Sequence, residues 1–76
     1  MHVSSGFLLL ETMPGHEGQV LELLGRFPGV THRNVLFPAA IAVRVESHTS
    51  VDHVAAQLKA LDGVIRTRLY RARLTV

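Results

Sequence analysis

The stretch GFLLLETMPG, residues 6–15, decides the fold more than any other part of the sequence. Residues 7–10 form an apolar run that is typical of a short buried strand, and Pro14-Gly15 marks a turn shortly behind it. After His16 the apolar residues recur with a helical period instead. Residues 6–15 therefore predict a buried strand that leads through a tight turn into a helix.

The predicted first helix begins at His16 and ends at Pro28-Gly29. Proline cannot continue the helical hydrogen-bond ladder, and glycine accepts the left-handed exit. The apolar residues of this segment stand at i, i+3, i+4 and i+7, the spacing of one helix face: Val20, Leu23, Leu24 and Phe27.

The next two strands are predicted at residues 34–37 and 40–46, and Pro38-Ala39 joins them as the turn of a hairpin. A second helix follows, because Thr49 and Asp52 have the spacing of a capping box. Its apolar stripe consists of Val51, Val54, Leu58 and Leu61. Asp62-Gly63 ends this helix, and residues 65–76 are predicted as the last strand.

The order strand, helix, strand, strand, helix, strand predicts a ferredoxin-like βαββαβ fold of the α+β class. Residues 21–30 and 55–64 resemble each other, because each segment ends a predicted helix with a Gly-Val pair. This internal repeat supports a fold that is built from two similar halves. We expect a four-stranded antiparallel sheet with two helices on one face, in a dimeric α/β barrel-like assembly. Residues 1–76 are predicted to form a single domain, with residues 1–5 as a leader.

Apolar residues are in surplus for a chain of this length. The sequence has 76 residues, 47% hydrophobic and 18% charged, and no cysteine to form a disulfide or a thiolate metal site. A domain of this size buries only roughly 60% of the surface that its unfolded chain exposes. The apolar run of four residues at 7–10 is far shorter than the roughly 20 residues of a membrane helix. We therefore expect a second copy of the chain to bury the surplus apolar residues, and we expect no membrane association.

The sheet face opposite the helices is the predicted place of that contact. Strands with one wet face alternate apolar and polar residues, whereas residues 7–10 are apolar on both sides. We predict a homodimer or higher homo-oligomer that stacks sheets or pairs their edges. The predicted interface residues are Phe7, Leu9, Ala42, Arg44 and Tyr70. The alternative is that these apolar side chains are exposed singly, as on many small domains.

Targeting signals are not visible in the sequence. Met1 is followed by His2 rather than by a basic region, and no long apolar stretch ends in small residues. The lack of cysteine fits a reducing compartment. A cytoplasmic location is therefore expected.

Neither a metal site nor a catalytic site is predicted. The chain has five histidines, but His48 and His53 are five positions apart, and no pair has the i, i+4 spacing of a helical zinc site. A nucleophile elbow, a buried carboxylate pair and a phosphate-binding glycine loop are all missing from the sequence. We expect a protein that is not an enzyme and that uses no cofactor.

Binding of nucleic acid has weak support. RNA-recognition modules stack bases on aromatic residues of their central strands, but residues 40–46 contain none. The arginines near the end of the chain could contact phosphates or simply protect a solvated edge strand, and they are Arg66, Arg68, Arg71 and Arg73. Direct binding of DNA is not expected.

Four segments in register carry a resemblance to a known family. They are GFLLLETMPG at 6–15, FPGV at 27–30, VRVE at 43–46 and DGVIRT at 62–67. Over residues 6–76 the sequence resembles the effector-binding domain of the Lrp/AsnC transcription regulators, and in particular members of that family that lack a DNA-binding half.

This resemblance implies a domain that dimerises through its sheets, forms rings, and binds a small molecule, usually an amino acid, at subunit interfaces. The implied ligand-binding residues are Phe37, Pro38, Ala39, Ala40, Thr67 and Leu69. The turn at 37–40 lacks the glycine and aspartate typical of the family, and Leu69 replaces a second threonine. Both differences remove polar groups that a zwitterion needs, so a more apolar ligand or none is equally open.

A second resemblance gives an alternative function. Residues 1–5, 27–30 and 62–64 are similar to the small ferredoxin-like chaperone of periplasmic nitrate reductase maturation, which binds a twin-arginine signal peptide. A dimeric ferredoxin-like monooxygenase would instead need polar residues between sheet and helices, where this sequence has aliphatic ones. The sequence thus favours an Lrp/AsnC-like module that binds a small effector and oligomerises, in metabolic or transcriptional regulation.

Overall fold

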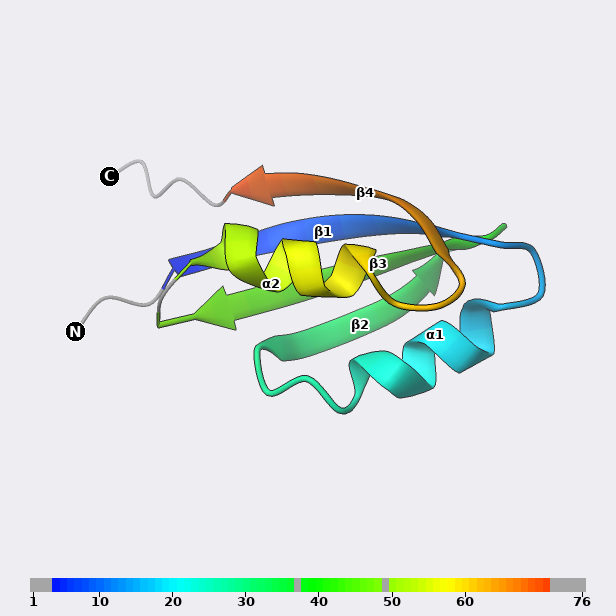
Figure 1. Ribbon diagram of the computed structural model, residues 1–76, viewed down its shortest axis with the longest axis horizontal. Coiled ribbons are helices and arrows are strands. Elements are labelled where there is room, and N and C mark those ends of the chain that lie inside the picture. Colours follow the sequence, from blue (N-terminus) through cyan, green and yellow to red (C-terminus); the bar gives the residue numbers. More distant parts are fainter. Residues whose placement is uncertain (1–3, 37, 49, 72–76) are drawn as a thin grey trace.

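The computed structural model describes residues 4–36, 38–48 and 50–71. Its elements are β1 (Ser4–Thr12), α1 (Glu17–Leu24), β2 (Val30–Leu36), β3 (Ala40–Ser47), α2 (Val51–Lys59) and β4 (Val64–Arg71). The strands form one antiparallel sheet in the order β2-β3-β1-β4. Both helices lie on the same face of this sheet (Figure 1). The predicted ferredoxin-like α+β fold is confirmed.

Strand β1 lies inside the sheet, between β3 and β4. Its side chains alternate between the two faces, so Leu8, Leu10 and Thr12 are buried under the helices. Phe7 and Leu9 point to the opposite face. The apolar run at residues 7–10 therefore contributes side chains to both faces of the sheet. Within a single chain, the helices cover only one of these faces.

The core lies between the sheet and the helices. It consists of Leu8, Leu10, Val20, Leu24, Ile41, Val43, Val45, Val51, Val54 and Leu58. Three of the four residues predicted for the stripe of α2 are in this core, and Leu61 packs against it. In α1 it is Leu21, rather than the predicted Leu23, that packs against the core beside Val20 and Leu24. Leu21 and Leu23 lie on either side of the Val20–Leu24 stripe, and the helix packs on the sheet with its Leu21 side.

Several predicted bounds were wrong. Strand β2 begins at Val30 rather than at residue 34, and α1 ends at Leu24, before Phe27. The N-cap of α2 is Ser50 rather than Thr49, because the Ser50 hydroxyl accepts a hydrogen bond from the Asp52 N–H at 3.1 Å.

The remaining differences concern the ends of elements. Helix α2 ends at Lys59, before Asp62-Gly63, and β1 already begins at Ser4, within the predicted leader. Strand β4 is described to Arg71. Thr49 and residues 72–76, which were predicted as a cap residue and as part of the last strand, lie outside the described residues. In the part of the chain that is described, neither helix is long and apolar enough to cross a membrane.

Candidate assembly and ligand-binding surfaces

The face of the sheet opposite the helices is here called the open face. Strand register places Phe7 of β1 beside Arg44 of β3 on one side and Tyr70 of β4 on the other. Leu9 lies two residues further along β1, with Ala42 as its neighbour on β3. Phe7 and Tyr70 are 52% and 55% exposed. The five residues predicted from the sequence for the dimer interface thus lie together on one surface.

Charged residues frame this apolar centre. Arg44 pairs with Glu46 at 3.6 Å, and Arg66 pairs with Glu11 at 3.2 Å. Both pairs are well exposed, so each adds little to stability within one chain. Arg68 lies beside Leu9, near the middle of the open face.

Sequence reasoning missed the contribution of β2 to the open face. Register places Asn34 beside Ala42 and Leu36 beside Ala40, and Leu36 is 45% exposed. The polar run Thr31 to Asn34 gave no alternation of apolar and polar residues from which this part of the strand could be predicted.

The β2–β3 turn holds the first group of predicted ligand-binding residues. Pro38 is exposed, whereas Ala39 and Ala40 are half-buried. Phe37 lies outside the described residues. The carbonyl oxygen of Ala39 accepts a hydrogen bond from the Thr12 N–H at 2.8 Å, which fixes the turn against the end of β1.

The second group of implied ligand-binding residues consists of Thr67 and Leu69 on β4. Both lie on the face of the sheet that the helices cover. They pair with Leu10 and Leu8 of β1, whose side chains point toward the helices. Leu69 packs against the core, whereas Ala40 pairs with Glu11 on the open face. Among the described residues, a single chain therefore does not bring Pro38, Ala39 and Ala40 together with Thr67 and Leu69 in one site.

Ala39 carries a testable backbone strain. Its φ is 58°, in the left-handed region that disfavours a side chain by roughly 1–2 kcal/mol. We expect Ala39→Gly to raise the free energy of unfolding by roughly 0.5 kcal/mol, after the greater chain entropy of glycine is subtracted. Urea titration measures the change. Ala40→Gly, inside β3, is the control and should lower stability by roughly 0.5–1 kcal/mol. If both variants changed the free energy of unfolding in the same direction, the result would contradict backbone strain at Ala39.

Unpartnered polar atoms gather where β1 leads into α1. Thr12 Oγ1, His16 Nδ1 and Glu17 Oε1 are buried without a hydrogen-bond partner among the described residues. His16 is the N-cap of α1 but makes no side-chain cap bond. Solvent does not reach these atoms, so no ligand contacts them in this conformation.

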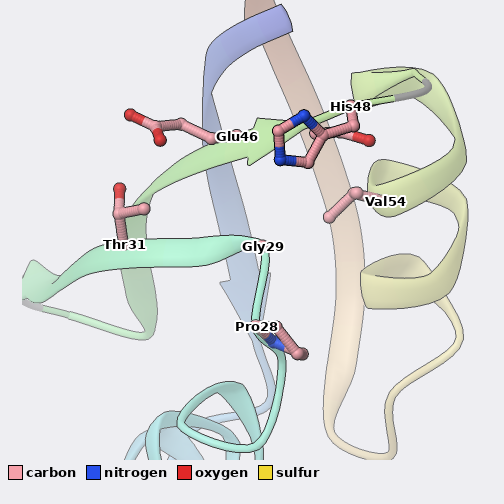
Figure 2. Close-up of a pocket in the computed structure, with 7 residues that line it drawn as sticks. Pro28, Gly29, Thr31, Glu46, His48 and Val54 are labelled. Atoms are coloured by element: carbon pink, nitrogen blue, oxygen red, sulfur yellow. The ribbon is translucent and has the colours of Figure 1, made fainter. Parts of the chain in front are cut away.

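A hollow of about 580 Å³ lies at the other end of the β2–β3 hairpin, between the start of β2 and α2 (Figure 2). Its lining consists of Pro28, Gly29, Thr31, Glu46, Ser47, His48 and Val54. None of these residues was a candidate from the sequence, because three distant segments contribute to it.

Metal ligands do not cluster in the described ranges. No three histidine, aspartate or glutamate side chains among these residues come close enough to hold a metal ion.

Two solved structures share this architecture. The crystal structure of FFRP-DM1 superimposes with a TM-score of 0.81 at 24% identity, over 92% of this chain and 99% of that chain. The hypothetical protein PHS023 from Pyrococcus horikoshii gives a TM-score of 0.77 at 26% identity, over 97% of this chain and 93% of that chain. FFRP-DM1 is a domain of the Lrp/AsnC-type feast/famine regulatory proteins, so the predicted resemblance is confirmed as a likeness of fold.

The search for relatives by sequence gave no match. No protein-family model matches the chain, and no curated protein matches it.

Proposed function

We propose that this chain is a non-enzymatic regulatory module of the Lrp/AsnC type, which assembles into homo-oligomers and binds a small effector. The observation that carries the proposal is the open face, where Phe7, Leu9 and Tyr70 form an apolar centre on a sheet whose other face is covered. The likeness of fold to FFRP-DM1 over almost the whole of both chains supports it.

The size of the open face is sufficient for a homodimer. Four strands about 4.8 Å apart, each about eight residues long at about 3.3 Å per residue, span roughly 19 by 26 Å. Two copies that stack these faces would bury roughly 1,000 Å² in total, which reaches the lower limit for a specific interface. The aromatic residues Phe7 and Tyr70 together with the arginines on this face match the usual composition of such interfaces.

The positions of the implied ligand-binding residues favour an effector site between chains. Ala40 faces away from the helices, whereas Thr67 and Leu69 face toward them, so one effector contacts both groups only if a second chain takes part. The turn at Pro38-Ala39 carries no charged side chain. We therefore expect an amino-acid-like effector whose apolar part lies against this turn.

A thermal-shift screen over the twenty standard amino acids tests the effector. We expect at least one to raise the melting temperature by about 10 °C or more at 100 times its Kd, where a ligand adds about 2.7 kcal/mol of stability. Thr67→Val should remove the shift by deleting a hydroxyl, whereas Thr31→Val, on β2, should keep it. If no amino acid stabilised the protein, the result would contradict binding of an amino-acid effector. It would not contradict the proposed homo-oligomer.

The alternative, a chaperone for twin-arginine signal peptides, has less support. Adjacent arginines of a peptide require carboxylates, but Glu11 and Glu46 on the open face already pair with Arg66 and Arg44. Titration with a twin-arginine peptide distinguishes the two functions, and we expect no binding.

A further inference from the structure

The hollow between β2 and α2 has the size of a ligand site. Its volume of about 580 Å³ falls within the roughly 300–1,000 Å³ of small-molecule pockets. Three segments border this half-open hollow: the link from α1 to β2, the end of β3, and the first turns of α2. Rigid elements therefore border it on two sides.

Gly29 keeps the floor of this hollow open. The Glu46 N–H donates a hydrogen bond to the Gly29 carbonyl at 2.8 Å, which anchors the start of β2 to the end of β3. A Cβ on residue 29 would lie 2.9 Å from the Glu46 carbonyl oxygen and 3.6 Å from Cγ2 of Val54. Close strand pairing thus requires glycine here, and its missing side chain leaves room beside Val54.

Apolar groups and one imidazole face this space. Figure 2 shows the ring of His48 and the side chain of Val54 directed toward the same region above Gly29, with Pro28 below it. The Glu46 carboxylate points away from this region, and its partner is Arg44 on the open face. The hollow therefore offers an N–H donor and an apolar wall, but no carboxylate turned inward.

These groups select the charge of a ligand. An imidazole N–H donates a charge-assisted hydrogen bond to a carboxylate, while Pro28 and Val54 contact a short aliphatic group. The ammonium of an amino acid would lose part of its hydration against Pro28 and Val54, and the carboxylate of Glu46, which lines the hollow, points away from this space, so an ammonium is disfavoured. We propose that this hollow binds a small carboxylic acid without an ammonium group, such as a branched 2-oxo acid, with His48 as the carboxylate anchor.

This site is separate from the proposed effector site. The effector turn at Pro38-Ala39 joins the end of β2 to the start of β3, whereas the hollow lies where β2 begins and β3 ends. Binding in the hollow does not depend on the proposed function, and the two sites are distinguished by which backbone amides respond to a ligand.

Titration of ¹⁵N-labelled protein with 3-methyl-2-oxobutanoate, followed by amide chemical shifts, tests the proposal. We expect saturable shifts around Gly29, His48 and Val54, and at least about tenfold weaker binding of valine, the matching amino acid. His48→Leu should weaken binding of the 2-oxo acid about tenfold or more, since leucine cannot donate the hydrogen bond to the charged carboxylate. His48→Lys should retain most of the affinity, because its ammonium also donates a hydrogen bond to a carboxylate.

His53→Leu is the matched control, since His53 is an exposed histidine on α2 that does not line the hollow. It should leave the affinity unchanged. The proposal is wrong if the 2-oxo acid causes no shifts at millimolar concentration, if valine binds equally well, or if His48→Leu and His53→Leu behave alike. Shifts confined to the turn at Pro38-Ala39 would also overturn it while supporting the effector site.

Discussion

The variant Leu9→Lys is expected to be a monomer under conditions in which the unchanged protein has at least twice the 8.4 kDa mass of one chain. Leu9 lies between Ala42 and Arg68 at the centre of the open face. A lysine there would place a second cation beside Arg68, in a region that stacked sheets keep away from water. Its ammonium would be buried without a counter-charge, which costs several kcal/mol.

Light scattering coupled to size exclusion at micromolar concentration measures this change. Val35→Lys is the control, because Val35 is an exposed apolar residue on the helix-facing side of β2, paired with Ile41 and away from the open face. The control should keep the mass of the unchanged protein. A monomeric unchanged protein would refute stacking of the open faces, and a Leu9→Lys variant that still assembles would place the contact elsewhere.

The variant Leu10→Ala is expected to lose between 2 and 5 kcal/mol of stability, the usual cost of such a core truncation. Leu10 is 0% exposed and lies between Ile41 and Thr67 on the neighbouring strands. A chain of 76 residues has a total stability of roughly 4–11 kcal/mol. The melting temperature should therefore fall by about 10 °C or more.

Calorimetry at one fixed protein concentration is the measurement, since assembly makes the melting temperature depend on concentration. Ile65→Ala is the control, because Ile65 is 61% exposed and should change stability by no more than about 0.5 kcal/mol. Equal losses in both variants would contradict the placement of Leu10 in the core.

Prediction from the sequence succeeded where side-chain periodicity and burial coincide. The run at residues 7–10 predicted a strand that is apolar on both faces, and Leu8 with Leu10 is in the core while Phe7 with Leu9 is not. It failed at β2, whose side chains are mostly exposed on both faces and carry no apolar period. Hydrogen bonds to β3 rather than side-chain burial set the bounds of that strand.

The candidate sites were predictable to different degrees. The residues of the open face share one strand parity, so Phe7 and Leu9 could be assigned to it from the sequence. The hollow could not be predicted, since Pro28, His48 and Val54 belong to three segments. The implied effector residues could be named from the resemblance, but only strand register showed that Ala40 and Thr67 lie on opposite faces.

The sequence by itself determined the order of elements, the turns, and the surplus of apolar residues that one small core does not hide. These properties follow from local periodicity, from proline and glycine, and from composition, all of which are fixed before the chain folds. Only the tertiary structure decided which face that surplus occupies, which side of α1 packs, and where Gly29 leaves a hollow beside Val54. The reason is that strand register and helix placement are set by contacts between residues far apart in the chain.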